Sequence, residues 1–241
     1  MAIYTSKTKI DLEDVGYSNK ITNKAILKIL ENAGARQSET IHFGLNDMEN
    51  VGFSWILLGW EVKILKRPIY NEELTINTWG RDSNRIFTYR DYEIYDESGE
   101  LCTIATSKWA IVDINTGKLR ELTPEIIEKY QCETKKVFEE DYTLKLKEPA
   151  TIIRRQEYKA QRRDIDINKH IHNLYYLDYA YETLPEEVYE APECNNIEIM
   201  YKKQIRLNDE FKCLYTKEEN QNIITIKSKD ENTLHAIIKL Y

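Results

Sequence analysis

The sequence predicts an α+β fold built from two similar halves. One order of elements, a strand, a turn, a helix and then four strands, occurs twice along the 241 residues. Two segments also echo each other: residues 66–74 can be laid over 203–211, and the turn at 14–18 over 166–170. A repeat of roughly 120 to 150 residues indicates a duplicated domain rather than a solenoid.

The first half is expected to open with a strand at residues 3–12. A helix follows, marked by an apolar stripe from Ala25 to Ala33. We expect Thr22 or Asn23 to cap this helix, because short polar side chains accept hydrogen bonds from first-turn amides, and Gly34 to end it. Turn-forming residues then separate four predicted strands, at residues 55–66, 74–81, 85–95 and 101–113.

The second half is expected to repeat this order. It begins with a strand at residues 154–163, and an apolar-aromatic helix follows at 174–184. Four more strands are predicted at residues 194–206, 211–217, 222–229 and 234–241. The charge-rich residues in between predict a connection, so we expect domains at 1–131 and 151–241 joined by a linker at 132–150.

Bulk composition is typical of a globular protein, with 41% hydrophobic and 31% charged residues. The net charge of −7 argues against a general nucleic-acid binder. The four cysteines form no C-x-x-C pair, which favours reduced, intracellular thiols. No apolar run reaches the roughly 18 residues of a membrane span, and the start lacks the pattern of a signal or transit peptide. We therefore expect a cytoplasmic protein.

The most polar segment lies between the predicted first strand and helix of the second half. Residues 164–173 hold two carboxylates, two carboxamides and two imidazoles, and Asn173 is the expected N-cap of the helix. A helix start carries partial positive charge and unbonded N–H donors. Such groups can polarise a carbonyl and position a water, which is the chemistry of acyl transfer or hydrolysis. The alternative is a capped turn whose Asp and Asn serve only the backbone.

The two copies of this turn differ. In the alignment above, Gly16 and Ser18 of the first half face Asn168 and His170 of the second. Only the second copy keeps groups that can donate, accept and titrate. We therefore expect the chemistry in the second half, with the first half shaping the pocket. Most of its aromatic residues are expected in the core, and a few in that pocket: Trp55, Trp60, Trp79, Trp109, Phe87 and Tyr89.

The segment Asp-Ile-Asp-Ile-Asn-Lys-His-Ile-His-Asn at residues 164–173 resembles the D-x-D-x-N-x-H-x-x-N signature of acyl-acyl-carrier-protein thioesterases of plants and bacteria. Residues 55–62, 78–81 and 107–113 resemble the first half of the same family, and the likeness runs over nearly the whole chain. It implies two tandem hotdog domains, each a long helix wrapped by an antiparallel sheet. It also implies hydrolysis of fatty acyl thioesters on acyl carrier protein, in fatty acid biosynthesis.

The resemblance assigns catalytic roles to three residues of the motif. Asn168 would hydrogen-bond the developing oxyanion, His170 would exchange a proton near neutral pH, and Asp166 would fix the imidazole or orient the water. One position departs from the family, because Gln204 stands where a catalytic Glu is usual and Ile205 where plant members carry Cys. Glutamine can hold a water but cannot accept its proton. A local structural role for Gln204 is equally compatible with the sequence.

Four further residues are assigned to substrate binding. His172 is expected beside or at the cap with Asn173, rather than as a metal ligand, because no third and fourth ligand lies at a familiar spacing. Arg162 and Arg163 belong to a basic segment with Arg154, Arg155 and Lys169. Such a segment is a solvated strand edge or a docking site for an acidic partner. The resemblance implies that the partner is acyl carrier protein.

These observations predict a thioesterase that needs no cofactor, no metal and no nucleic acid. A homodimer stays open, because the sequence does not decide the oligomeric state. Two alternatives stay open. One is an acyl-CoA thioesterase or another hotdog enzyme, such as a dehydratase, which would use similar polar groups. The other is a non-catalytic protein that binds acyl thioesters, in which Gln204 would reflect lost catalysis.

Overall fold

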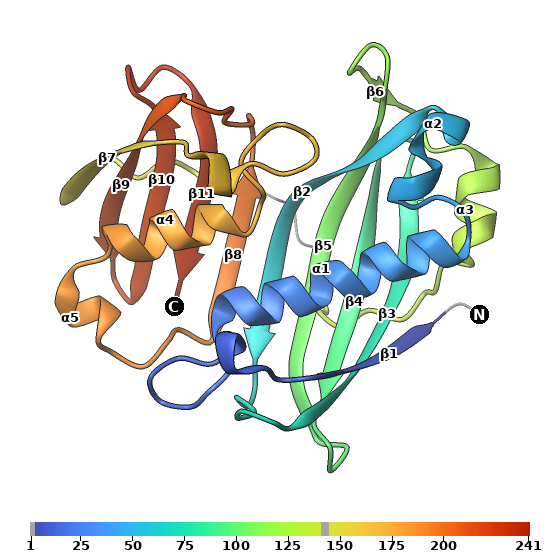
Figure 1. Ribbon diagram of the computed structural model, residues 1–241, viewed down its shortest axis with the longest axis horizontal. Coiled ribbons are helices and arrows are strands. Elements are labelled where there is room, and N and C mark those ends of the chain that lie inside the picture. The colour runs from blue at the N-terminus through green and yellow to red at the C-terminus, as the bar shows by residue number, and fades with distance from the viewer. Residues whose placement is uncertain (1–2, 141–144) are drawn as a thin grey trace. The chain divides into compact units, whose positions relative to one another are not determined.

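The computed structural model describes residues 3–140 and 145–241, and its contacts divide the chain into two compact units, residues 1–143 and 144–241. Each unit is an antiparallel sheet with one main helix laid across it (Figure 1). The α+β prediction is confirmed. Within the described residues, no helix is both long enough and apolar enough to cross a membrane.

The first unit holds five main strands around a long helix. Its sheet has the order β1-β3-β4-β5-β2, and every neighbouring pair is antiparallel. The strands are β1 (Tyr4–Lys9), β2 (Phe53–Ile64), β3 (Glu73–Asn84), β4 (Phe87–Tyr95), β5 (Leu101–Asp113) and the short β6 (Leu119–Arg120) on β5. The helices are α1 (Asn23–Thr40), α2 (Met48–Val51) and α3 (Pro124–Tyr130), with 3-10 turns at Leu12–Asp14 and Leu45–Asp47.

Helix α1 begins where the sequence predicts, because the Thr22 side chain accepts a hydrogen bond from the Ala25 amide at 3.2 Å. Its end was predicted wrongly. Gly34 does not stop the helix but lies inside it, close to the side chains of Tyr92 and Arg90 on strand β4. A Cβ at Gly34 would lie 2.9 Å from the Tyr92 hydroxyl and 3.1 Å from Arg90 Cδ. The glycine is thus explained by close helix–sheet packing rather than by a turn.

Part of the expected linker packs on the first sheet. The Glu133 amide donates to the Gly80 carbonyl at 2.9 Å, and the Trp79 indole donates to the Lys135 carbonyl at 2.9 Å. The Val137 amide donates to the buried carboxylate of Asp91 at 3.1 Å. Residues 141–144 of the expected linker lie outside the described residues.

The second unit repeats the layout with a shorter helix. Its sheet has the order β8-β11-β10-β9-β7, again antiparallel throughout. The strands are β7 (Arg154–Lys159), β8 (Asn196–Tyr201), β9 (Glu210–Glu218), β10 (Gln221–Ser228) and β11 (Leu234–Leu240). The helices are α4 (Tyr175–Thr183) and α5 (Glu186–Tyr189), and a 3-10 turn lies at Arg162–Asp164.

Two strands of the second unit end earlier than predicted. Strand β7 stops at Lys159 because the next residues form a 3-10 turn, closed by a hydrogen bond from the Gln161 amide to the Asp164 carboxylate at 2.7 Å. Strand β8 stops at Tyr201, and the residues after it turn toward the loop that follows Asp164.

The duplication is confirmed, but the predicted register of the turn is wrong by two residues. The bridge Val15–Ile21 of the first unit recurs as Ile165–Ile171, and Lys20–Ile69 recurs as His170–Arg206. Residue 71 therefore matches 208, which agrees with the predicted overlay of 66–74 on 203–211; both residues have positive φ. In the turn, however, the structure matches Gly16 with Asp166, Ser18 with Asn168, and Lys20 with His170. The shared residue is the buried Asp14, which matches Asp164.

Candidate functional site

The loop at residues 165–171, here called the motif loop, is a tight hairpin in the second unit. Ile165 and Ile171 bridge its two ends. The Asp166 amide donates to the His170 carbonyl at 3.0 Å, and the Lys169 amide donates to the Asp166 carbonyl at 3.0 Å. Lys169 closes the turn with a φ of 64°, a conformation that polar turn residues adopt more readily than branched ones. The loop thus turns three side chains of alternate residues toward one another.

Asp166 is the centre of this cluster. One of its carboxylate oxygens accepts from the Asn168 backbone amide at 2.8 Å, and the other accepts from the Asn168 side-chain amide at 3.4 Å. The first oxygen also lies 3.8 Å from Nδ1 of His170. The Asp166 and His170 side chains keep 11% and 22% of their surface exposed, whereas Asn168 is exposed. The structure therefore brings the three predicted catalytic residues together in a half-buried cluster.

The His170 imidazole is held in one tautomer by its own backbone neighbourhood. Nδ1 lies 3.1 Å from the Ile171 carbonyl oxygen. A carbonyl can only accept, so Nδ1 carries the proton and donates it. Nε2 is left with its lone pair, which is the form a general base requires. The carboxylate of Asp166 at 3.8 Å would stabilise the imidazolium that forms when Nε2 takes up a proton.

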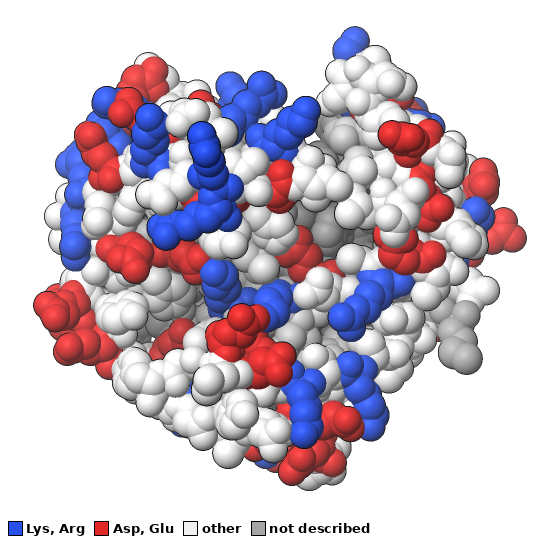
Figure 2. Space-filling view, in the orientation of Figure 1, with Lys and Arg blue, Asp and Glu red and all other residues white. Residues whose placement is uncertain are grey.

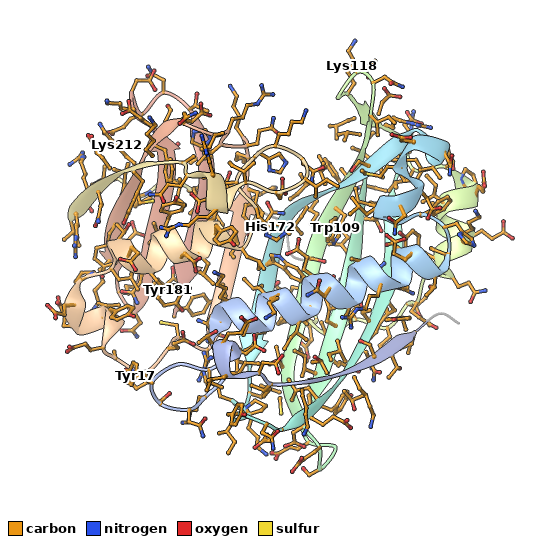
Figure 3. All side chains as sticks on the ribbon, in the orientation of Figure 1. Tyr17, Trp109, Lys118, His172, Tyr181 and Lys212 are labelled. Carbon is orange, nitrogen blue, oxygen red and sulfur yellow. The ribbon has the colours of Figure 1, made fainter. Side chains whose placement is uncertain are left out.

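The predicted cap at Asn173 is wrong. Helix α4 begins at Tyr175 with Leu174 in the N-cap position, and the residue whose side chain serves the first turn is His172. Its Nδ1 accepts from the Leu174 amide at 3.3 Å, immediately before α4 (Figure 3). The first unit explains the difference, since its capping residue Thr22 matches His172 in the observed register. Asn173 instead offers its carbonyl, which accepts from the Tyr201 hydroxyl at 3.1 Å.

Gln204 follows strand β8 and is exposed beside the motif loop. The next residue, Ile205, accepts from the Ile171 amide at 2.8 Å and so fixes this segment to the end of the loop. In the first unit the matching position is Arg67. Its guanidinium donates to the Ile21 carbonyl at 2.9 Å and to the Asn23 side chain at 2.7 Å. The first unit, which lacks the motif, thus has a long cationic side chain at the position where the second unit has the shorter, neutral amide of Gln204.

Arg162 and Arg163 are the two exposed residues of the 3-10 turn that precedes the motif loop. The guanidinium of Arg163 is 3.7 Å from the Asp164 carboxylate rather than at Asp166. Arg154 and Arg155, from the same predicted basic segment, are engaged elsewhere in the unit. Arg154 donates to the Leu184 carbonyl at 2.9 Å, and Arg155 lies 3.8 Å from Glu231.

Several residues around the loop were missed by the sequence reasoning. The exposed cations Lys202, Lys203 and Arg206 flank Gln204, and the Arg206 backbone bridges to His170. Together with Arg162, Arg163 and Lys169 they form what we call the basic rim. Lys and Arg side chains gather over the upper side of the second unit (Figure 2). The three tyrosines that hydrogen-bond this region, Tyr176, Tyr179 and Tyr201, were also missed. These tyrosines stand out only when the second unit is compared with the first in the observed register.

Of the six aromatic residues expected in the core or in the pocket, two lie in the core of the first unit: Trp60 and Trp79 are 1% and 0% exposed. The other four are only partly buried, so the prediction that most of this group lie in the core is wrong: Trp55, Phe87, Tyr89 and Trp109. In the part of the chain that is described, no cluster of three or more His, Cys, Asp or Glu side chains is arranged to hold a metal ion.

Comparison with known proteins identifies one family along nearly the whole chain. The family description "Acyl-ACP thioesterase N-terminal domain" matches residues 1–130, and "Acyl-ACP thioesterase C-terminal domain" matches residues 147–239. Among curated proteins, oleoyl-acyl carrier protein thioesterase 2 of Arabidopsis thaliana is 24% identical over 92% of this chain and 65% of its own length. The oleoyl-acyl carrier protein thioesterase of Coriandrum sativum is 23% identical over 93% of this chain and 65% of its own length. The chain spans less than two thirds of the length of these relatives.

Two solved structures share the fold. An acyl-ACP thioesterase from Bacteroides thetaiotaomicron has a TM-score of 0.87 at 22% identity, covering 99% of this chain and 97% of its own. A 12:0-ACP thioesterase from Umbellularia californica has a TM-score of 0.87 at 16% identity, covering 100% of this chain and 96% of its own. These matches confirm the tandem hotdog architecture that the sequence resemblance implied.

Proposed function

The chain belongs to the acyl-ACP thioesterase family, and from that premise we propose that it hydrolyses fatty acyl thioesters carried on acyl carrier protein, releasing free fatty acid and the carrier. One observation carries the proposal: Asp166, Asn168 and His170 converge on one loop, with Nε2 of His170 left as an acceptor. The names of the plant relatives support the same substrate class.

In the proposed reaction, His170 acts as general base. Nε2 takes a proton from a water while the water oxygen attacks the thioester carbonyl, giving a tetrahedral oxyanion. The side-chain amide of Asn168 donates to that oxyanion, and Asp166 holds the amide in place through its two hydrogen bonds to Asn168. When the C–S bond breaks, the imidazolium returns its proton to the thiolate. The products are a carboxylic acid and a thiol, and no cofactor enters the balance.

Gln204 is proposed to hold the attacking water. Its side chain offers both a donor and an acceptor, and it is exposed next to the segment bonded to the motif loop. It cannot store the proton, so His170 alone would be the base. The substitution of an amide for the usual carboxylate also supports a second candidate function, in which the protein binds acyl thioesters with little turnover.

The basic rim is proposed to dock the carrier. Its six members are all exposed, and the backbone of one of them, Arg206, bridges directly to His170. Arg162 and Arg163, predicted as substrate-binding residues, belong to this rim. Guanidinium and ammonium groups at the mouth of a site attract an acidic protein, or the phosphate of its prosthetic arm, and speed its encounter. His172 and Asn173 are proposed to bound the site on its helix side.

A hydrolysis assay tests the function. Acyl chains of several lengths would be offered on carrier protein and on coenzyme A, and released thiol would be measured. We expect faster release from the carrier. His170→Ala should lower kcat by about 10²- to 10⁴-fold and Asn168→Ala by about 10²- to 10³-fold. The matched controls are Lys20→Ala and Ser18→Ala, which truncate the corresponding residues of the first unit and should change kcat less than about twofold.

The outcomes separate the candidates. Wild-type rates in both motif variants would refute the assigned residues. Tight binding of acyl carrier protein without thiol release would favour the non-catalytic function, and faster release from coenzyme A would favour an acyl-CoA thioesterase. We further propose a cytoplasmic role in fatty acid synthesis. The four cysteines support this proposal, because they form no disulfide and intracellular proteins usually keep their thiols reduced.

A further inference from the structure

Three tyrosines of the second unit occupy positions that are buried and aliphatic in the first. The register of the repeat pairs Tyr176 with Ile26, Tyr179 with Ile29, and Tyr201 with Ile64. The three isoleucines are 1%, 8% and 4% exposed and belong to the core. A hydroxyl at such a position is costly to desolvate unless it is hydrogen-bonded. The tyrosines therefore need an explanation that core packing does not supply.

Each hydroxyl is bonded to the frame of the candidate site. The Tyr179 hydroxyl donates to the Asp164 carboxylate at 2.6 Å. The Tyr201 hydroxyl donates to the Asn173 carbonyl at 3.1 Å, and the Tyr176 hydroxyl accepts from the Ile205 amide at 3.2 Å. These three contacts lie before the motif loop, after it, and on the segment that carries Gln204. The hydroxyls thus surround the candidate catalytic residues without belonging to them.

Asp164 connects the chain segments that precede and follow the motif loop. Besides the Tyr179 hydroxyl, its carboxylate accepts from the Gln161 amide at 2.7 Å, and its carbonyl accepts from the His172 amide at 2.9 Å. It therefore ties together the chain on both sides of the motif loop. In the first unit the matching Asp14 is bonded instead to Lys28 at 2.8 Å. The second unit replaces a flexible, partly exposed ammonium partner with a phenol on a packed ring.

The rings are themselves fixed by aromatic contacts. Tyr176 packs edge-on against Tyr201 with ring centroids 5.5 Å apart, and Tyr179 packs against Phe211 at 4.8 Å. Burial, together with the hydrogen bond to Asp164, holds the pKa of Tyr179 above its ordinary value. Its hydroxyl therefore stays a donor over the whole neutral range.

We propose that Tyr176, Tyr179 and Tyr201 are positioning residues, whose hydroxyls hold the motif loop and the Gln204 segment in the geometry that thioester hydrolysis requires. Reactive groups must be placed within a fraction of an ångström, and a misplacement of about 1 Å can lower a rate by about a hundredfold. The first unit shows that the same loop folds without these hydroxyls. Their presence in the second unit is thus tied to its chemistry, so the kinetic part of the proposal rests on the proposed function.

The kinetic test removes one hydroxyl at a time. Tyr176→Phe, Tyr179→Phe and Tyr201→Phe should each lower kcat for acyl carrier protein substrates by about 10- to 100-fold, with KM within about twofold of wild type. The matched control is Tyr215→Phe. Tyr215 is a buried tyrosine of the same unit whose hydroxyl donates to Asn222 at 3.0 Å, away from the motif loop. Equal kcat losses in Tyr215→Phe, or unchanged kcat in all three variants, would overturn the proposal.

Amide hydrogen exchange tests the same proposal without activity. The amides of Asp166, Ile171 and His172 are bonded within the frame and should exchange about tenfold faster in the three variants. Amides of strand β10 should keep their wild-type rates, as should the loop amides in Tyr215→Phe. Faster exchange throughout the unit would show a loss of stability and overturn a positioning role. If the wild type hydrolyses no acyl thioester, the proposed function fails, while this measurement still decides the role of the hydroxyls.

Discussion

At the scale of single residues, Gln204 gives the sharpest test of the proposed reaction, because its side chain is an amide where the family resemblance predicts a carboxylate. Gln204→Glu would add a second group able to take the proton of the attacking water. We expect kcat to rise at least tenfold, since general-base assistance is typically worth about 10²–10⁴. Steady-state hydrolysis of acyl carrier protein substrates measures this, with Gln221→Glu as a control that adds the same charge at the start of β10.

An unchanged rate in Gln204→Glu would mean that His170 already accepts the proton without assistance. The position would then serve only to hold the water. A gain shared by Gln221→Glu would trace the effect to net charge, not to the site.

His235 allows a pH prediction that concerns stability instead of catalysis. It is 7% exposed, and its Nδ1 donates to the Lys203 carbonyl at 2.7 Å. Burial is the largest cause that lowers its pKa below the ordinary 6.5; the charge of Lys203 acts in the same direction, and the hydrogen bond and Asp209 act against it. A depressed folded-state pKa means that the neutral imidazole stabilises the fold above about pH 6.5. This contribution is lost as the pH falls through the folded-state pKa.

The measurement is the free energy of unfolding in urea at pH 7 and pH 5. His235→Asn keeps a donor near Nδ1 but cannot titrate, so we expect it to lose less stability than wild type over this range. His42→Asn is the control, because the His42 side chain is 84% exposed and the formal charge change is the same. Equal pH dependence in wild type and His235→Asn would contradict the prediction.

At the scale of elements, the sequence predicted most strands of both units within two or three residues, because alternation and turn residues are local signals. It did not predict the early end of β7. That end depends on the carboxylate of Asp164 closing a turn onto Gln161, a choice between two backbone geometries that hydrophobic pattern does not distinguish. Helix α3 was also missed, although Thr123 and Pro124 form a recognisable start, with the Thr123 side chain accepting from the Ile126 amide.

The candidate site was predictable in part for the same reason. Asp166, Asn168 and His170 lie in one short segment, so their proximity needs no knowledge of the fold. The hydroxyls of Tyr176 and Tyr201 act across the unit, on Ile205 and Asn173, and such contacts are invisible without the register of the duplication. The predicted register was wrong because the sequence around Asp14 can be aligned with either Asp164 or Asp166. Only the backbone bridges, Val15–Ile21 and Ile165–Ile171, show that Asp14 corresponds to Asp164.

Gly34 gives a prediction at the scale of elements. Replacing it by alanine is expected to lower the free energy of unfolding, although alanine is normally favoured over glycine inside a helix. Alanine is favoured over glycine inside a helix by about 1 kcal/mol, but here its Cβ would press on the buried Tyr92 hydroxyl, which has 0% exposure and lies against Ser107. Overpacking costs about 1–3 kcal/mol, so Gly34→Ala should lower the free energy of unfolding by about 1 kcal/mol. In a Tyr92→Phe background this closest contact is removed and the Arg90 side chain remains at 3.1 Å, so the same change should cost less than in the wild type. Urea unfolding of the four proteins measures this, and equal losses in both backgrounds would contradict the explanation.

At the scale of the whole molecule, the duplication separates the shared scaffold from the candidate catalytic residues. Both copies retain the bridged loop, the buried aspartate and the helix that follows it. The first copy fills the remaining positions with Gly16, Ser18, Lys20 and Arg67, none of which offers an imidazole or a carboxylate. A fold that carries the loop twice can thus lose the reactive groups in one copy without losing the loop itself.

Net charge gives the prediction that tests the molecule as a whole. The chain carries −7, so the proposed acidic carrier would be repelled at long range and would have to be drawn in by a local cationic surface. Arg162→Glu with Arg163→Glu reverses two charges of the basic rim. We expect kcat/KM on acyl carrier protein to fall at least tenfold at low salt, with kcat nearly unchanged, because encounter is impaired and chemistry is not.

The control places comparable changes away from the rim. Arg85→Glu with Lys118→Glu reverses two exposed charges of the first unit and shifts the net charge by the same amount. If long-range repulsion set the rate, both pairs would lower kcat/KM equally. If docking on the basic rim sets it, only the rim pair would do so. The difference between the pairs should shrink at an ionic strength near 1 M, where the Debye length is about 3 Å and exposed charges are screened. A rim effect that ignores salt would point to lost packing contacts and contradict electrostatic docking.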